Sequence, residues 1–287
     1  MIYISSSCIK SDYLRDSVEL LAKSGFSHIE LSYGGKYYEG YQGDLLALKE
    51  KYGLDYLCHN YFVPEKNEFI INLASQNSRI YERSIGYLNN AITMAKEFGS
   101  KRYGFHAGFF LDIENDEIGK KIRPKLLYNK ERAIELFCDA YQELNKFAKQ
   151  KNIDLYVENN VLASENALTF SGNKPFMLLT FEDYQEISKR IEFRLLLDIG
   201  HLKVTSNSLD IDYLDELDKM IGKAEYIHLS ENDGKIDLHK GILKDSVFLG
   251  IVKNINIKNK IITLEIRDDI FKIKESYQLL EEAIGNE

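Results

Sequence analysis

The sequence has few of the features that mark secreted, membrane-spanning or nucleotide-binding proteins. Its three cysteines, Cys8, Cys58 and Cys138, are odd in number and widely separated, which predicts a reducing compartment and no disulfide framework. No run approaches the roughly 20 apolar residues that cross a bilayer. The start, Met1 to Ile4, has no basic region ahead of an apolar one, as a signal peptide would. We therefore expect a cytoplasmic protein that does not contact a membrane.

The sequence also has fewer basic than acidic residues. The 287 residues include 37 Lys and Arg against 45 Asp and Glu, which gives a net charge of -8. Surfaces that bind nucleic acid through its phosphates carry an excess of Lys and Arg, so a nucleic-acid partner is not expected, although a local basic groove is compatible with this charge. With 44% hydrophobic and 29% charged residues, the composition fits an ordinary globular protein with a sizeable core.

Hydrophobic periodicity predicts eight strands that alternate with helices. Glycines stand where several of the helices should end, as at Gly25, Gly53 and Gly99. The predicted strands span 2–6, 26–32, 54–62, 102–106, 153–159, 193–198, 224–230 and 260–266. The predicted helices span 12–23, 44–52, 79–98, 130–149, 181–189, 213–221, 238–254 and 270–284, and two long connections span 107–128 and 161–179.

Such strict alternation implies parallel strands joined by right-handed helical crossovers. Eight strand–helix units predict an α/β fold of the closed (β/α)8 type, a single TIM barrel. A doubly wound open sheet is the alternative, but Ser5-Ser6-Ser7-Cys8 follows the first strand, where a glycine-rich phosphate loop would be needed. We therefore expect no nucleotide cofactor. The lack of a linker or of a change in composition predicts one domain over residues 1–287.

The most informative stretch is Leu195 to Lys203. Its leucines predict a buried strand that ends abruptly at Asp198, where a carboxylate would emerge at a polar site. Gly200 predicts a tight turn that brings His201 back toward Asp198. A strand followed by a capping Asp and an ordinary surface His explains this stretch equally well, so the other strand ends have to decide between the two interpretations.

Histidines and carboxylates gather at those strand ends. Active sites of such barrels form at the carboxyl ends of the strands, and five of the six histidines lie at or beyond these ends, whereas His28 begins a strand. Imidazole and carboxylate together are ligands for zinc, manganese, cobalt or iron, so we predict a divalent-metal site. The residues are His59, His106, Glu158, Asp198, His201, His228, Glu231, Asp237, His239 and Glu265.

Each of these residues also has an ordinary explanation when it is taken singly. His59 or His106 could be a hydrogen-bonded core histidine, Glu231 could face solvent, and Asp237 could cap a helix. The conjunction of so many at one end of a barrel favours the metal site.

At these positions the sequence resembles the xylose-isomerase-like TIM barrels, a superfamily that holds sugar isomerases and epimerases together with endonuclease IV. The resemblance covers nearly the whole chain. It rests on four short motifs in the expected order at the expected strand ends, namely Val157-Glu158-Asn159, Leu197-Asp198-Ile199-Gly200-His201, Ile227-His228-Leu229-Ser230-Glu231-Asn232-Asp233-Gly234 and Leu264-Glu265.

The keto-sugar epimerases of this group imply one set of roles. A single divalent metal (manganese, cobalt, magnesium or zinc) would polarise the carbonyl of a sugar, and Glu158 and Glu265 would move a proton alpha to that carbonyl. His201 would contact the substrate. Lys235 stands near the place of a family Arg, which is a departure from the pattern, and it could replace that Arg in binding the substrate. With one metal bound, the other residues at this end would bind substrate instead, namely His59, His106, Asp237 and His239. The metal ligands implied are Glu158, Asp198, His228 and Glu265.

Endonuclease IV implies another set of roles, a three-zinc cluster that activates a hydroxide and clamps a phosphodiester. The acidic charge and the lack of an evident basic, aromatic-rich loop argue against DNA as the substrate. The nine ligands implied are His59, His106, Glu158, Asp198, His201, His228, Asp237, His239 and Glu265.

We expect first a metal-dependent isomerase or epimerase of a small sugar or sugar phosphate. A multinuclear zinc phosphoesterase comes second, and a barrel that binds a sugar without turnover comes third, because loss of catalysis usually lets ligands drift. A homo-oligomer is left open.

Overall fold

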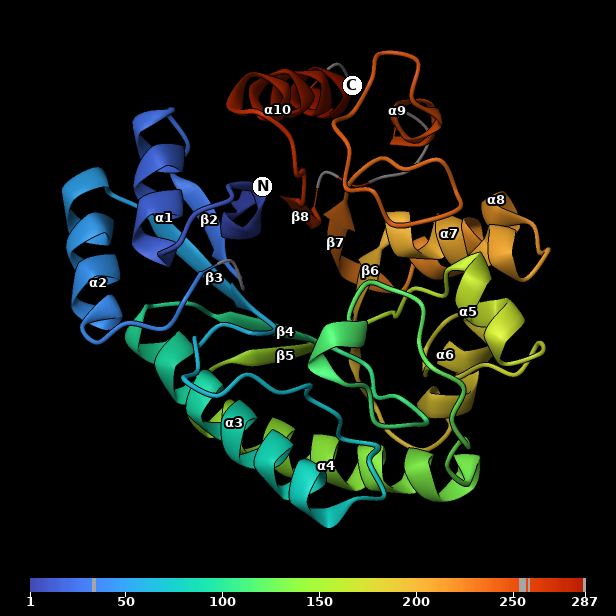
Figure 1. Ribbon diagram of the computed structural model, residues 1–287. Coiled ribbons are helices and arrows are strands. Elements are labelled where there is room, and N and C mark those ends of the chain that lie inside the picture. Colours follow the sequence, from blue (N-terminus) through green and yellow to red (C-terminus); the bar gives the residue numbers. More distant parts are fainter. Residues whose placement is uncertain (33–34, 253–256, 258, 286–287) are drawn as a thin grey trace.

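The chain folds into one closed barrel of eight parallel strands surrounded by helices, a (β/α)8 TIM barrel (Figure 1). The computed structural model describes residues 1–32, 35–252, 257 and 259–285. Each strand pairs with its neighbours in the sequence, and β8 pairs with β1 to close the barrel. The strands are β1 (Ile2–Ser5), β2 (His28–Leu31), β3 (Asp55–His59), β4 (Arg102–His106), β5 (Asp154–Glu158), β6 (Arg194–Asp198), β7 (Ala224–Leu229) and β8 (Ile261–Leu264).

All eight predicted strands are confirmed, and the fold class with them. The helices of the outer ring are α1 (Leu14–Lys23), α2 (Tyr41–Tyr52), α3 (Ser78–Glu97), α4 (Lys130–Gln150), α5 (Ser164–Thr169), α6 (Phe181–Ser188), α7 (Ile199–Ser208), α8 (Tyr213–Ile221), α9 (Val247–Val252) and α10 (Ile270–Gly285), with short 3-10 helices η1 (Ser6–Cys8) and η2 (Asn115–Glu117). Among the described residues, no helix is long and apolar enough to span a bilayer.

The predicted helix over 238–254 is largely wrong. Only Val247–Val252 is helical within the described part of this segment, and residues 253 and 254 lie outside the described residues. The segment before α9 instead folds back on the end of β7, because Glu231 and Lys240 form an antiparallel bridge with backbone hydrogen bonds of 2.7 and 2.9 Å. His239 adopts a left-handed φ of 48°, which a helix does not accommodate.

The strand pleat divides the side chains into an outer and an inner set, since successive residues of a strand point to opposite faces. The outer set packs against the helices and forms the main core. The inner set fills the barrel with a compact apolar layer, which consists of Tyr3, Leu57, Tyr156, Leu196 and Tyr226. The residue two positions further along each strand also points inward and lies one layer closer to the carboxyl end. This second layer contains the candidate site.

The two long connections, which follow β4 and β5, pack against each other rather than extending into solvent. Phe109 and Phe176 form an antiparallel bridge between them. A separate apolar cluster joins the two segments and consists of Leu111, Ile122, Leu162, Phe170, Phe176 and Leu179. Because they follow strand ends, these connections wall one side of the barrel's carboxyl end.

Candidate metal centre

The inner layer at the carboxyl end of the barrel is mostly titratable. Leu57 is followed two residues later by His59, Tyr156 by Glu158, and Leu196 by Asp198, and the same step leads from Tyr226 to His228. The strand period therefore places ligating side chains directly above the apolar layer. The uncharged members of this layer are Ser5 and Thr263, and Glu265 lies two residues beyond Thr263. The titratable members are Glu30, His59, His106, Glu158, Asp198 and His228.

Asp198 and His201 are brought together by a helix, not by the predicted tight turn at Gly200. Asp198 caps α7, and its Oδ1 accepts a hydrogen bond of 2.7 Å from the His201 backbone N–H. Gly200 lies in the first turn, where an added Cβ would come within 3.2 Å of the Asp198 carboxylate. The helix places His201 Nε2 3.7 Å from Asp198 Oδ2, so the expected proximity of the two side chains is observed.

Asn159, which follows β5, holds both of these residues in place. Its amide accepts from the Asp198 N–H at 2.7 Å and donates to the Asp198 carbonyl at 3.0 Å. His201 Nδ1 lies 3.0 Å from the Asn159 carbonyl. Because a carbonyl only accepts, Nδ1 carries the proton, and Nε2 is the ring nitrogen that faces the site.

Glu158 lies at the centre of the site and is fully buried. Its Oε2 is 2.8 Å from His59 Nε2 and 3.1 Å from His106 Nδ1. Its Oε1 is 3.2 Å from His228 Nδ1. The two oxygens of one carboxylate therefore face histidines of different strands, which is the arrangement of a carboxylate that can bridge two cations.

Asp237 and His239 complete the site from the loop after β7. Asp237 caps no helix; its Oδ2 lies 2.7 Å from His239 Nε2 and 3.3 Å from His201 Nε2. His239 Nδ1 donates to the Glu265 carbonyl at 3.1 Å, and the Arg267 N–H donates to the His239 carbonyl at 2.8 Å. These bonds attach the loop to the end of β8 and turn Nε2 of His239 toward the site.

Carboxylates determine the pKa shifts of two histidines in the site, whereas burial determines the shifts of Asp198 and His106. Burial acts to lower the pKa of His201 and of His228, but neighbouring carboxylates outweigh it and hold both well above the usual value. Burial raises the pKa of Asp198 to about 6. His106 keeps 27% of its side-chain surface exposed, yet desolvation lowers its pKa to about 4. At neutral pH His106 is therefore an uncharged imidazole that can bind a metal.

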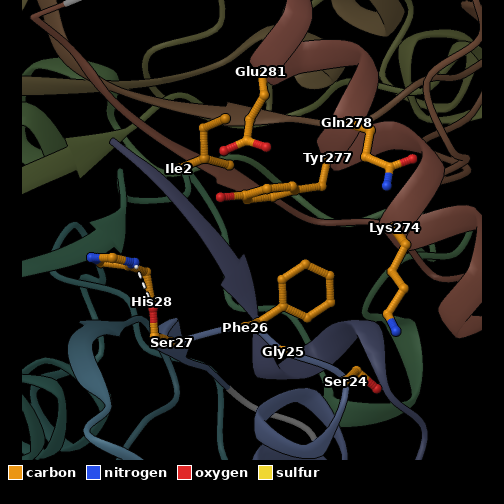
Figure 2. A pocket seen from close by; sticks show the side chains of 10 residues that line it. All are labelled: Ile2, Ser24, Gly25, Phe26, Ser27, His28, Lys274, Tyr277, Gln278 and Glu281. Atoms are coloured by element: carbon orange, nitrogen blue, oxygen red, sulfur yellow. Dashed lines mark hydrogen bonds between the residues drawn. The ribbon is translucent and has the colours of Figure 1, made fainter.

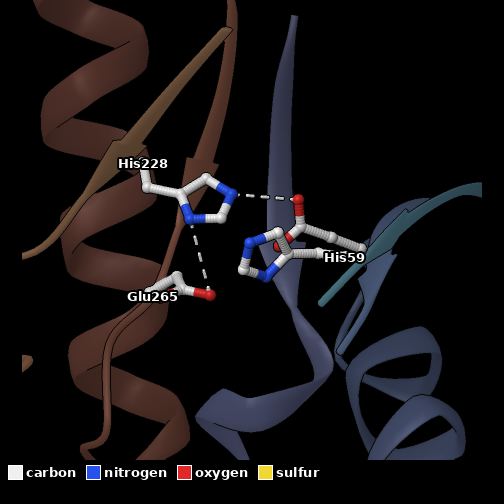
Figure 3. A group of neighbouring side chains, drawn as sticks. His59, His228 and Glu265 are labelled. Carbon is white, nitrogen blue, oxygen red and sulfur yellow. Dashed lines mark hydrogen bonds and ion pairs between the residues drawn. The ribbon is translucent and has the colours of Figure 1, made fainter. Parts of the chain in front are cut away.

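These side chains fit divalent metal ions. Buried polar atoms without a hydrogen-bond partner point into the site, among them Glu158 Oε1, Asp198 Oδ2 and His228 Nδ1. A buried charge requires a partner or a metal. Figure 3 shows His59 of β3 and His228 of β7 turned toward each other and toward Glu265, which directly follows β8. Three groups have ligand atoms close enough to hold an ion, namely Glu30 with His59, His228 and Glu265, His106 with Glu158 and His201, and Glu158 with Asp198 and His228.

The structure thus brings together all nine residues that the sequence singled out for a cluster. The possible substrate contact of Lys235 stays a prediction. Lys235 is exposed, and its side chain makes no hydrogen bond or ion pair with the described part of the cluster. Glu231 does not simply face solvent, because it accepts hydrogen bonds from Lys203 and Ser246 and keeps only 19% side-chain exposure.

Sequence reasoning missed Glu30. It is completely buried in β2, and its Oε2 lies 3.0 Å from His228 Nε2. The available signal was a carboxylate between Ile29 and Leu31 in a short apolar strand, because a parallel strand buried on both faces seldom tolerates an ionised residue without a partner.

A pocket of about 320 Å³ lies at the opposite end of the barrel, where β1 and β2 begin beside α10 (Figure 2). His28 and Glu281 are among its lining residues. The pocket contains none of the three candidate metal groups in the described part of the chain. It is therefore distinct from the metal centre.

The fold is a TIM barrel with groups of histidines and carboxylates that could hold a metal ion at the carboxyl ends of its strands. The model of the xylose isomerase-like TIM barrel family matches residues 18–283. The chain belongs to this family. A search of curated protein sequences found no match.

Several solved structures share this fold at low sequence identity. A D-tagatose 3-epimerase-like protein is 18% identical, with a TM-score of 0.74 over 99% of this chain and 97% of that chain. An L-ribulose 3-epimerase is 17% identical, with a TM-score of 0.64 over 96% and 86%. Endonuclease IV from Thermus thermophilus is 16% identical, with a TM-score of 0.60 over 100% and 99%. At these identities the likeness concerns the fold, and the reaction has to be argued from the site.

Proposed function

We propose that this protein is a hydrolase that uses more than one divalent metal ion to cleave a phosphoester of a small substrate. This differs from the single-metal isomerase that the sequence favoured. The observation that carries the proposal is the position of Glu158, whose Oε2 faces His59 and His106 while its Oε1 faces His228.

This position argues against Glu158 as a proton-transfer group. An acid or base must come within hydrogen-bond reach of the substrate atom that it protonates or deprotonates. Glu158 is 1% exposed at its side chain, and histidines occupy the space next to both oxygens. The pair Glu158 and Glu265, which the epimerase interpretation requires on opposite sides of a sugar, therefore lacks one accessible member.

The buried charge argues for several ions. Five carboxylates gather in the site, and removing such charges from water is costly unless they are compensated. One divalent ion would leave most of this charge to be balanced by protonated histidines. The carboxylates are Glu30, Glu158, Asp198, Asp237 and Glu265.

Divalent ions bound there would supply Lewis acidity, which lowers the pKa of water and neutralises charge on a phosphoester. The protein residues determine the direction of approach. His106, Asp237 and Glu265 keep 27%, 15% and 11% side-chain exposure, whereas Glu158 and Asp198 form a closed floor. A substrate would approach past the three more open side chains.

Glu265 is a candidate to accept a proton from the attacking water, since it keeps 11% side-chain exposure whereas Glu158 keeps 1%. Burial acts to raise its pKa, but neighbouring histidines, His228 foremost, outweigh burial and lower it. Glu265 is therefore ionised at neutral pH. The net charge of -8 favours a small phosphorylated substrate over duplex DNA.

A single-metal sugar isomerase or epimerase is the second candidate. It is favoured by the group of Glu158, Asp198 and His228, which could hold one ion without the remaining residues. Glu265 lies 3.7 Å from His228 Nδ1 and could join this group as a fourth ligand.

Elemental analysis of the wild-type protein and of His106→Ala tests the proposal. We expect more than one ion per chain in the wild type and fewer in His106→Ala, with His28→Ala as a control because His28 lies at the opposite end of the barrel. The metal-loaded enzyme should hydrolyse p-nitrophenyl phosphate or its diester. One ion per chain, unchanged by His106→Ala, together with solvent-deuterium exchange into a ketose, would establish the isomerase instead.

A further inference from the structure

We propose that Glu30 is a positioning residue that fixes the orientation and tautomer of His228 for metal binding. The inference rests on the proposed function only in requiring a metal at His228, and it applies whether one ion or several are bound. Glu30 Oε2 and His228 Nε2 are 3.0 Å apart, and both side chains are fully buried. They come from β2 and β7, so their contact crosses the interior of the barrel.

The contact determines which nitrogen of His228 can be a ligand. An ionised carboxylate only accepts, so the proton of the shared hydrogen bond resides on Nε2. The other nitrogen, Nδ1, faces Glu158 Oε1 at 3.2 Å and Glu265 Oε1 at 3.7 Å. A histidine that donates its second N–H to a carboxylate is a stronger and better oriented metal ligand. Glu30 therefore directs the Nδ1 lone pair of His228 into the cluster.

Glu30 is in turn held by neighbouring side chains. The Thr263 hydroxyl donates to Glu30 Oε2 at 3.3 Å, and the Tyr226 hydroxyl lies 3.1 Å from Thr263 Oγ1. Tyr226 belongs to the apolar layer beneath the cluster. A chain of hydrogen bonds thus leads from Tyr226 in the packed layer through Thr263 and Glu30 to His228. The rigid interior of the barrel therefore determines the orientation of the His228 ring.

A direct ligand role for Glu30 is the competing interpretation, because its carboxylate lies close enough to His59, His228 and Glu265 to share an ion with them. The hydrogen-bond distance to His228 Nε2 favours the positioning role. If Oε2 were the ligand atom, an ion would take the place of this N–H donor, and His228 would have to use Nε2 instead of Nδ1. Oε1 has no hydrogen-bond partner among the described residues, so the measured stoichiometry has to distinguish a ligand role through Oε1.

The test is Glu30→Gln in the full-length chain, with zinc or manganese alone as the probe. Glutamine keeps the shape and can still accept from Nε2, but it lacks the charge. We expect unchanged stoichiometry by elemental analysis and about 10- to 100-fold weaker affinity by chelator competition. Thr263→Val should weaken affinity less, and it also serves if Glu30→Gln does not fold. Glu216→Gln is the control, since its buried carboxylate accepts from the Phe181 N–H instead.

Nitrogen NMR of histidine-labelled protein supplies a readout that is independent of activity. In the zinc-loaded wild type, His228 should show a protonated Nε2 and a metal-bound Nδ1, whereas in zinc-loaded Glu30→Gln part of the population should show the reverse. Unchanged affinity in Glu30→Gln would overturn the proposal, and so would the loss of one ion per chain, which would make Glu30 a ligand. A wild-type stoichiometry of one ion would refute the multinuclear hydrolase and leave the test of Glu30 intact.

Discussion

A methyl group added at Gly104 should distort the metal centre from below. Gly104 lies in β4, and a Cβ built on it would be 2.7 Å from Leu196 Cδ1 and 2.9 Å from His59 Cδ2. Carbon atoms in contact prefer separations of about 3.5–4.0 Å. Leu196 is fully buried in the inner apolar layer, so it has little room to move. His59 is held at 2.8 Å from Glu158.

We therefore expect Gly104→Ala to lower the free energy of unfolding by about 1–3 kcal/mol, the usual range for overpacking a core. It should also weaken metal binding, because the added methyl displaces the His59 ring from Glu158. Gly86→Ala is a matched control in α3, where a Cβ would meet nothing within 4 Å. There the same change should raise stability by about 0.5–1 kcal/mol, because alanine is the better helix former.

Urea denaturation of the metal-free proteins and chelator competition of the loaded proteins measure these effects. The two substitutions differ only in their surroundings, so their opposite signs test the packing around Gly104. If Gly104→Ala were as stable as the wild type and bound metal equally well, the close approach of β4 to His59 and Leu196 would be refuted.

Two further predictions follow from the charges. Burial acts to raise the pKa of Glu117, but hydrogen bonds from Arg123 and Lys125 outweigh it and hold that pKa below the ordinary value of 4.5. The contribution of Glu117 to stability is therefore present above pH 4.5 and is lost as the pH falls toward the pKa of the folded state. Glu117→Gln should lower the free energy of unfolding by about 1–3 kcal/mol at pH 7 and by less near pH 3. Denaturation curves measure this, and Glu182→Gln is the control that should show no change, since Glu182 is 88% exposed. Metal affinity should fall as pH is lowered from 8 to 6, because the raised pKa values of His201 and His228 mean that protons must leave before an ion binds; titration calorimetry that gave one affinity at both pH values would contradict this.

The sequence was sufficient for the barrel because its strands are short apolar runs and several helices end at glycines. The sequence pattern did not predict α7, because residues on every face of this helix are buried, among them Ile199, Leu202, Thr205 and Ser206. Such a helix lacks the polar face that produces an amphipathic pattern. The predicted helix before α9 was wrong for the opposite reason. Its apolar residues have helical spacing, but a bridge to Glu231 and bonds to the end of β8 determine its path.

The ligand positions could be predicted because they depend on local order, namely which residue ends each strand. The hydrogen bonds and ion pairs between these residues could not be predicted, because they depend on contacts across the barrel. Glu30 and His228 are 198 residues apart in the sequence, and the burial of Glu30 becomes intelligible only when that partner is known. The same holds for Asn159, whose amide orients Asp198 from the neighbouring strand.

The choice between the two reactions depends on His59 and His106. A single-metal isomerase needs Glu158 to have an oxygen open to the substrate, and it requires no imidazole next to that oxygen. Here two imidazoles from β3 and β4 lie within 3.1 Å of Glu158 Oε2, and neither has another carboxylate partner that close among the described residues. His106 belongs to a candidate metal group with Glu158 and His201, and His59 belongs to another with Glu30, His228 and Glu265. On the proposed function the two imidazoles would therefore bind different ions. An ion held by either group, in addition to one held by Glu158, Asp198 and His228, would supply further Lewis acidity, which lowers the pKa of water and neutralises charge on a phosphoester.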